Sequence, residues 1–176
     1  MITSPQEYWS ILYRIQDANR PDIIGPGNFP DFQVPAVETI YNIDLHARTI
    51  EAPRYLSVQH DHKSEFVYFR CPQFYDAMDL SRLCCIIQYK NANGDERIYP
   101  VPFLDLRTEH AEENMLIPWL LDGEVTRYAG TVEFAIRFYE VDADNHAFIY
   151  SLNTQPAKSV ILHGLDSVSD DHYDYD

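Results

Sequence analysis

The chain has little glycine and few basic residues, and it has no long hydrophobic run. It contains 6 glycines in 176 residues, which are too scattered to form a glycine-rich phosphate-binding loop. Its 13 lysines and arginines stand against 28 aspartates and glutamates, so the formal net charge is −15. That charge opposes contact with nucleic acid phosphates and anionic lipid, and we expect neither nucleic acid nor a membrane as a partner. No stretch approaches the roughly 18 apolar residues of a membrane-spanning helix.

Cysteine is scarce as well. Cys71, Cys84 and Cys85 are an odd number of thiols and define no disulfide framework. Cys84 and Cys85 are neighbours in an apolar run, and in a strand they point to opposite faces. We expect buried, small hydrophobic side chains there, with a redox or metal role as the less favoured alternative. The first residues lack the basic and apolar regions of a signal peptide, so we expect folding in a cytoplasm.

Apolar and aromatic residues, in contrast, are abundant. Hydrophobic residues make up 45% of the chain and aromatic residues 14%, and 13 residues are tyrosine. A disordered chain does not carry this composition. The length predicts a single domain whose core buries roughly 70% of the surface of the unfolded chain.

Residues 4–16 carry the pattern of a short amphipathic helix. Ser4 and Glu7 form a capping box, Pro5 suits the first helical position, and apolar residues then recur at helical spacing. Residues 17–37 contain four prolines and several large apolar residues, which is typical of an extended arm that lies on an apolar partner. The side chains expected to bind neighbouring proteins are Trp9, Ile11, Leu12, Ile15, Phe29 and Phe32.

From about residue 38 the hydrophobic period changes to two, which is typical of β-strands. The predicted strands cover 38–45, 65–70, 84–90, 97–106, 115–121, 131–141, 147–152 and 157–162. Turn signals separate them and join 84–106 and 131–152 into hairpins. The pattern predicts an all-β fold, an antiparallel β-sandwich of the Ig or jelly-roll kind, behind the short N-terminal helix and arm. The predicted domains are 1–37, a helix and docking arm; 38–165, the sandwich; and 166–176, an acidic disordered tail.

Two strands carry more detailed predictions. Pro118 has no N–H group for a sheet ladder, so strand 115–121 suits the edge of a sheet. In strand 131–141 the side chains that alternate toward one face, the core face, are Val132, Phe134, Ile136 and Phe138. Those that alternate toward the other face are Glu133, Arg137 and Tyr139.

His60 and His62 are the sharpest local candidates for a metal site. If they lie in a strand, their side chains project to the same face about 6 to 7 Å apart, and a third ligand from elsewhere could complete a site. A metal-dependent hydrolase is the third-ranked hypothesis on this basis. The favoured interpretation is a polar strand end or turn before the strand that begins near Glu65.

Asp142, Asp144 and Asn145 resemble the start of a calcium-binding loop. The sequence lacks the glycine at the sixth position and the glutamate at the twelfth, so the favoured interpretation is a hairpin turn. Residues 109–113 are charged and are interpreted as a solvated loop. The chain has no Gly-x-Ser-x-Gly motif. We therefore predict no catalytic residues and no cofactor, and the four weak metal candidates are His60, His62, Asp142 and Asp144.

Tyrosines accompany most of the predicted strands, namely Tyr41, Tyr55, Tyr68, Tyr75, Tyr89, Tyr99, Tyr139 and Tyr150. Most are expected to pack within the sandwich, because tyrosine has a large apolar body. The others could contact proteins or sugars. The second-ranked hypothesis is accordingly a carbohydrate-binding sandwich that aids attachment to a host, with exposed tyrosines and Trp119 stacked on sugar rings and acidic loops holding calcium.

A series of strand and turn motifs runs through residues 38–165. They include Ile43-Asp44-Leu45, Arg48-Thr49-Ile50, Tyr55-Leu56-Ser57-Val58-Gln59 with Asp61-His62, Ile86-Ile87-Gln88-Tyr89, Asn91-Ala92-Asn93-Gly94, Val101-Pro102-Phe103, Ile117-Pro118-Trp119, Gly130-Thr131-Val132, Arg137-Phe138-Tyr139, Leu152-Asn153-Thr154 and Pro156-Ala157-Lys158. In these motifs the chain resembles small structural proteins of tailed phages and prophages of Gram-positive bacteria. It is also similar, more loosely, to the N-terminal module of phage baseplate upper proteins.

The resemblance implies a non-enzymatic virion protein that is assembled in the host cytoplasm. Its sandwich would dock to tail, baseplate or capsid neighbours, with other virion proteins and further copies of itself as partners. Baseplate upper proteins continue into a stalk, whereas this chain stops at Asp176. We therefore expect an anchor, adaptor or decoration subunit rather than the protein that recognises the host. A host glycan is the alternative partner.

Overall fold

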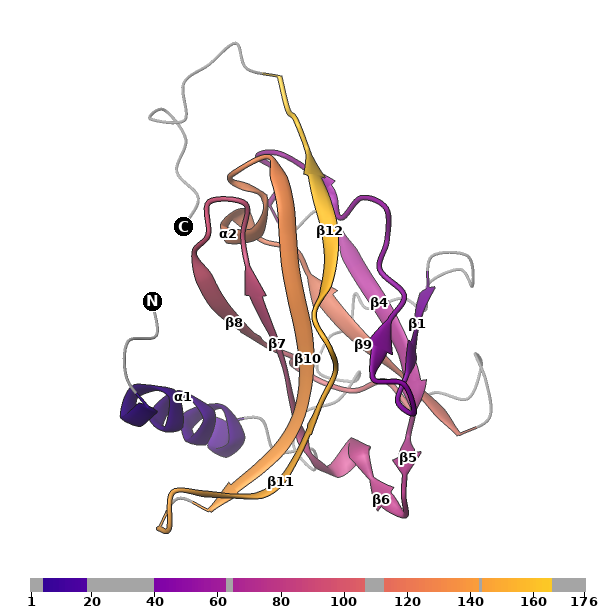
Figure 1. Cartoon of the computed structure of the whole chain (residues 1–176), viewed down its shortest axis with the longest axis vertical. Helices are drawn as coiled ribbons and strands as arrows, with labels where there is room; N and C mark the ends of the chain where they lie inside the picture. Colours follow the sequence, from indigo (N-terminus) through magenta and orange to yellow (C-terminus); the bar gives the residue numbers. More distant parts are fainter. Residues whose placement is uncertain (1–4, 19–39, 63–64, 107–112, 143, 166–176) are drawn as a thin grey trace.

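Two β-sheets packed face to face form the body of the protein in the computed structural model (Figure 1). The structure describes residues 5–18, 40–62, 65–106, 113–142 and 144–165. Strands dominate these residues, with one helix near the N-terminus, so the predicted fold class is confirmed.

The first sheet has the strand order β2-β1-β4-β9. Its strands are β1 (Ile40–Asp44), β2 (Thr49–Ile50), β4 (Phe66–Pro72) and β9 (Asn114–Leu120). Pro118 therefore lies in the outermost strand of this path, as its missing N–H group predicted.

The second sheet has the order β3-β12-β10-β7-β8, and β11 pairs with β10 beside this path. Its strands are β3 (Ser57–Val58), β7 (Cys84–Lys90), β8 (Glu96–Pro100), β10 (Gly130–Asp142), β11 (Ala147–Asn153) and β12 (Ala157–Leu162). The long strand β10 spans both halves of this sheet. Its first part pairs with β12 and its second part with β11, so β10 and β11 form a ribbon that continues past the other strands (Figure 1).

Shorter elements complete the described chain. They are the helix α1 (Pro5–Ala18), the two-stranded pair β5 (Phe74–Tyr75) and β6 (Met78–Asp79), the 3-10 turn η3 (Leu80–Arg82) and the single-turn helix α2 (Gly123–Thr126). None of the helices within the described ranges is long and apolar enough to cross a membrane.

The core lies between the two sheets. Alternate side chains of β10 point into it as predicted, and Val132, Phe134, Ile136 and Phe138 are all buried. Phe134 packs against Phe69 of the first sheet, with 5.7 Å between the ring centroids. This interlock of inner faces is the packing that a sandwich requires.

The sheets are mixed rather than purely antiparallel, which corrects one part of the prediction. Strands β1 and β4 pair in parallel, as do β3 and β12, whereas the other strand pairs are antiparallel. A parallel pair needs a crossover between its strands. Period-two alternation reports which face a side chain takes but not the direction of the neighbouring strand, so the sequence pattern did not contain this information.

Several strand bounds follow the prediction closely, and one does not. The strands over 84–90 and 157–162 have the predicted bounds. The strand predicted over 97–106 ends early, because β8 stops at Pro100 and Asp105 instead forms an isolated bridge to Leu116 of the first sheet. The turn at Asn91-Gly94 closes the β7–β8 hairpin as expected.

The three thiols are free and buried, as the sequence indicated. Cys85 belongs to the core between the sheets, whereas Cys84 belongs to a second apolar cluster on the opposite face. Burial raises the pKa of Cys71 to about 12. Burial is also the main cause that raises the pKa of Cys84 to about 11. Both are therefore protonated at neutral pH.

Two predicted segments lie outside the described residues. They are the proline-rich arm with Phe29 and Phe32, and the acidic tail over 166–176. Their assignments, and the domain boundaries drawn from them, stay predictions.

Candidate functional site

The helix α1 packs on the outer face of the second sheet, beside the ribbon of β10 and β11 (Figure 1). Leu12 is the centre of this contact and is 0% exposed. The apolar side chains that pack with it are Tyr8, Trp9 and Ile15 of the helix, and Cys84, Ile86, Ile98, Tyr139 and Val141 of the sheet. The helix is thus part of the folded domain.

Hydrogen bonds fix the C-terminal half of α1 to β10. The Tyr139 hydroxyl donates to the Leu12 carbonyl at 2.7 Å. Gln16 donates its Nε2 to the Val141 carbonyl at 3.1 Å, and its Oε1 accepts from the Val141 N–H at 2.7 Å. Strand β7 pairs with β10 only as far as Tyr139, so the Gln16 amide takes the place of a strand partner beyond that point.

Arg137 of β10 fixes the N-terminal half of the helix. It donates from Nη1 to the Tyr8 hydroxyl at 2.6 Å, and that hydroxyl donates to Gln88 Oε1 at 3.1 Å. The guanidinium also lies over two aromatic rings, 5.7 Å from the centroid of Tyr8 and 5.2 Å from that of Phe148. Burial raises the pKa of Tyr8 while the charge of Arg137 opposes the rise, so the hydroxyl remains a donor.

Large apolar side chains remain exposed next to this anchored helix. The Trp9 ring packs on Phe148 of β11 at 4.9 Å between centroids and lies 6.3 Å from the ring of His146. Phe148 is nevertheless 39% exposed, and its neighbour Ile149 is 61% exposed. We call Trp9, Phe148 and Ile149 the β11 surface.

The β11 surface was not predicted from the sequence, although the sequence contains an indication of exposed apolar residues there. Phe148 and Ile149 are adjacent, and adjacent residues in a strand face opposite sides, so at least one of two large apolar side chains points away from the core. In the structure, Glu140 pairs with Tyr150 and Val141 pairs with Phe148, so Ile149 is the extra residue of a β-bulge. A bulge bends the strand and changes the direction in which its side chains point.

The four helix residues predicted to contact neighbouring proteins differ in how far they are buried. Leu12 is fully buried and Trp9, Ile11 and Ile15 are partly buried. Leu12, Trp9 and Ile15 pack against this chain's own sheet. Leu12 therefore has no surface left for another protein in this arrangement. Tyr139, predicted to face away from the core, does so, but it is fully buried because α1 covers that face.

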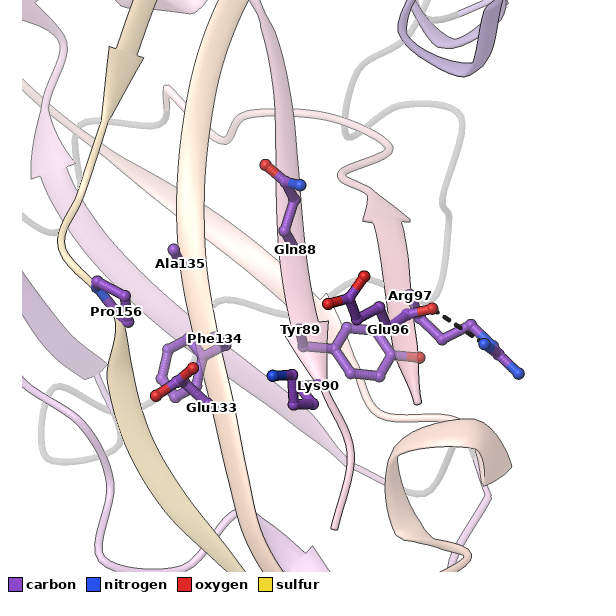
Figure 2. Close-up of a pocket in the computed structure, with 9 residues that line it drawn as sticks. All are labelled: Gln88, Tyr89, Lys90, Glu96, Arg97, Glu133, Phe134, Ala135 and Pro156. Atoms are coloured by element: carbon purple, nitrogen blue, oxygen red, sulfur yellow. Dashed lines mark hydrogen bonds between the residues drawn. The ribbon is translucent and has the colours of Figure 1, made fainter. Parts of the chain in front are cut away.

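A shallow depression of about 250 Å³ lies on the same sheet (Figure 2). Its polar rim includes Gln88, Lys90 and Glu133. The two aromatic residues at this place, Tyr89 and Phe134, are 7% and 1% exposed because their rings belong to the core. The depression therefore presents no aromatic face on which a sugar ring could stack.

Trp119 cannot serve as a sugar platform either, which corrects the second-ranked hypothesis on this point. Its side chain is 0% exposed and packs between Tyr89 and Phe134, with centroid distances of 5.6 and 5.2 Å. The inward phase of β9 places it in the core. Among the tyrosines, Tyr68, Tyr89 and Tyr139 are buried, whereas Tyr55 is exposed.

The two histidines do not share a strand face, because β3 ends at Val58. His60 follows in a turn with φ of 76°. His62 accepts a hydrogen bond from the Gly123 N–H at 2.8 Å, so Nδ1 holds the start of α2. Within the described part of the chain, no group of three His, Cys, Asp or Glu side chains could hold a metal ion.

Asp142 and Asp144 lie where β10 turns into β11. The Asp142 carboxylate accepts from the Asp144 N–H at 3.0 Å and from Asn145 Nδ2 at 2.6 Å. The side-chain hydrogen bond from Asn145 is the main cause that lowers the pKa of Asp142. These are the contacts of a hairpin turn, the favoured interpretation of this motif.

The chain has little detectable similarity to known proteins. No family model matches the chain, and no curated protein matches it. Among solved structures, it is similar to the N-terminal domain of phage TP901-1 ORF48, with a TM-score of 0.39 and 7% sequence identity. The match covers 70% of this chain and 96% of that one. The likeness is weak and loose, and the function proposed below rests on other observations.

Proposed function

We propose that the protein is a non-enzymatic structural subunit of a phage particle, which binds neighbouring virion proteins through the β11 surface. The observation that carries the proposal is the exposure of Phe148 and Ile149 beside a helix that is fixed to the sheet. The anchor, adaptor and decoration roles all fit this proposal.

The chemistry of the β11 surface is that of a protein contact. Aromatic residues are enriched in protein interfaces, and charged residues are depleted from interface centres. Trp9, Phe148 and Ile149 carry no charge themselves, and the guanidinium of Arg137 lies over the Phe148 ring. Arginine is also among the residues enriched in protein interfaces.

The hydrogen bonds beneath the β11 surface favour binding further. Arg137 holds Tyr8 and stacks on Phe148, and Gln16 holds Val141. Side chains that are already ordered lose less conformational entropy when a partner binds.

The phage setting comes from the strand and turn motifs over residues 38–165, which resemble those of phage structural proteins. It gives the partners as other virion proteins and the location as the virion.

The experiment is to detect the protein in particles purified from its source by density gradient, with an antibody raised against the recombinant chain. Particles of a deletion strain are then complemented with the wild type, with Ile149→Lys, and with Leu165→Lys as the control. Leu165 is also a highly exposed aliphatic residue, but it lies outside the β11 surface. We expect incorporation of the wild type and the control, and at least a tenfold loss for Ile149→Lys. Absence of the wild-type protein from particles would overturn the proposal.

A further inference from the structure

The strand β11 has one edge without a strand partner in the part of the chain that the structure describes. It pairs with β10 alone. At its C-terminal end the turn after β1 covers the other edge, because Arg48 donates to the Asn153 carbonyl at 3.1 Å and accepts from the Gln155 N–H through its own carbonyl at 2.7 Å. The uncovered stretch is therefore residues 147–151, which includes Phe148 and Ile149.

This edge carries little of the usual protection against association. Natural edge strands are commonly blocked by lysine, proline, inward-pointing charge or a β-bulge, and of these β11 has only the bulge. The sequence of β11 is AFIYSLN, without charge, proline or glycine. The bulge at Ile149 interrupts the ladder to β10, but it also presents the most exposed apolar side chain of the strand.

Charges lie at the two ends of β11 with opposite sign. The hairpin turn before the strand carries Asp142 and Asp144, and both carboxylates are exposed or partly exposed. Beyond the other end stands Arg48, bound to the Asn153 carbonyl. The side chains of β11 between these two ends carry no charge of their own, although the guanidinium of Arg137 from β10 lies over the Phe148 ring.

We propose that the β11 surface binds a second copy of this chain across a two-fold axis near Ile149, with the two β11 strands antiparallel. In a two-fold contact the same patch meets itself. Antiparallel strands bring the acidic end of one copy opposite the basic end of the other, so that Asp144 faces the neighbour's Arg48. The two-fold axis places Ile149 against Ile149, although two chains that each carry −15 repel elsewhere.

This inference names a second copy of the chain as a partner of the β11 surface, and it rests on the proposed function only because it uses the same surface. The test is sedimentation velocity of the purified full chain over a wide concentration range, at low and at high salt. We expect a reversible dimer that weakens as salt rises. Ile149→Lys should weaken dimerisation at least tenfold, and Leu165→Lys should leave it unchanged.

Charge reversal tests the orientation of the two strands. Asp144→Lys and Arg48→Glu should each weaken the dimer, and an equimolar mixture of the two variants should form a heterodimer more readily than either forms a homodimer. Since Arg48 also holds Asn153, circular dichroism of each variant must match the wild type. Should Arg48→Glu fail to fold, Asp144→Lys is mixed with wild type instead. That heterodimer keeps one of the two attractive contacts, so it should be weaker than the wild-type dimer and stronger than the Asp144→Lys homodimer. Failure of the mixture to recover dimerisation would overturn the antiparallel arrangement.

The outcomes separate the two proposals. A wild-type chain that stays monomeric at every concentration, or an Ile149→Lys chain that dimerises like the wild type, overturns the self-association. If the wild type is monomeric and Ile149→Lys is still excluded from particles, the β11 surface binds a different virion protein and the proposed function stands. A dimer that never enters particles supports the self-association and overturns the proposed function.

Discussion

The hydroxyl of Tyr139 donates a hydrogen bond to the backbone carbonyl of Leu12, and this bond joins the strand β10 to the helix α1 across 127 residues of sequence. Both residues are 0% exposed. The sequence predicts that this amphipathic helix docks on a neighbouring protein, whereas in the structure it packs on the sheet of its own chain. The surface proposed to bind a partner combines Trp9 of the helix with Phe148 and Ile149 of β11.

Removal of that hydroxyl should loosen the helix. Tyr139→Phe leaves the ring in place but deletes the donor to Leu12, so we expect a loss of about 1 kcal/mol in the free energy of unfolding. Urea denaturation followed by circular dichroism measures it. Tyr13→Phe in the exposed part of the same helix is the control, since surface changes of this kind stay within about 0.5 kcal/mol. Equal stability of the two variants would contradict the role of the hydroxyl.

The side-chain amide of Gln16 provides a second test of the helix position. In Gln16→Glu the carboxylate can still accept from the Val141 N–H, but it faces the Val141 carbonyl without a donor. We expect a loss of about 1 to 3 kcal/mol at neutral pH, the cost of a buried acceptor left unpaired. Protonation of the introduced carboxyl restores a donor, so the loss should shrink in acid.

Gln6→Glu is the matched control for this variant, because Gln6 is exposed in the first turn of the same helix. Its stability should stay within about 0.5 kcal/mol of the wild type. Denaturation at neutral and acidic pH compares the two. A loss in Gln16→Glu that is the same at both pH values would show that the amide is not paired as described.

Much of the fold could be predicted from the sequence, because strands show a local alternation of hydrophobic and polar residues. The side chains of β10 follow a strict period of two, and its inward residues were correctly predicted. The two-residue strands β2 and β3 were not, since two residues are too short to show a period. The parallel pairing of β1 with β4 was not predicted for a different reason: hydrophobic alternation is the same in parallel and antiparallel strands.

The candidate site was harder to predict from the sequence, because it depends on which elements pack against each other in the folded chain. The apolar stripe of α1 has the same appearance whether it packs on its own sheet or on a neighbour, and only the structure shows Leu12 against Tyr139. The hairpin turn at Asp142 was correctly interpreted, since its hydrogen bonds are local. The favoured interpretation of His60 and His62, a polar strand end or turn, agrees with the structure, since β3 ends at Val58 and His60 lies in a turn.

The turn between β7 and β8 depends on one buried side chain. Asn91 Oδ1 accepts from the N–H groups of Asn93 and Asp95, both at 3.0 Å, and Nδ2 donates to the Glu124 carbonyl at 3.1 Å. Asn91→Ala removes these three bonds, at about 1 kcal/mol each, and a longer one from Nδ2 to the Asp95 carboxylate at 3.4 Å, so we expect a loss of about 3 kcal/mol. Asn93→Ala, in the same turn but exposed, should cost less than about 1 kcal/mol. Thermal unfolding of the two variants side by side measures this, and a larger loss at Asn93 would reverse the assignment.

The buried thiols predict how stability depends on alkaline pH. Burial raises the pKa of Cys71 to about 12 in the folded chain, whereas an unfolded thiol titrates near 9. Below pH 9 the thiol is protonated in both states, and its contribution to stability is fully present. As the pH rises from 9 toward 12, the unfolded state loses its proton first, so the free energy of unfolding falls by up to about 1.4 kcal/mol per pH unit for this group.

Urea denaturation at a series of pH values between neutral and strongly alkaline checks this dependence. Cys71→Ala removes the titrating group, so its stability should fall less steeply with pH than that of the wild type. Val125→Ala makes a comparable cavity without a titratable group, and should lower stability by a constant amount while it keeps the wild-type slope. A wild-type slope in Cys71→Ala would mean that this thiol is not held protonated by burial. The alkaline loss would then belong to the other groups whose pKa values burial raises, namely Cys84, Cys85, Tyr89 and Tyr139.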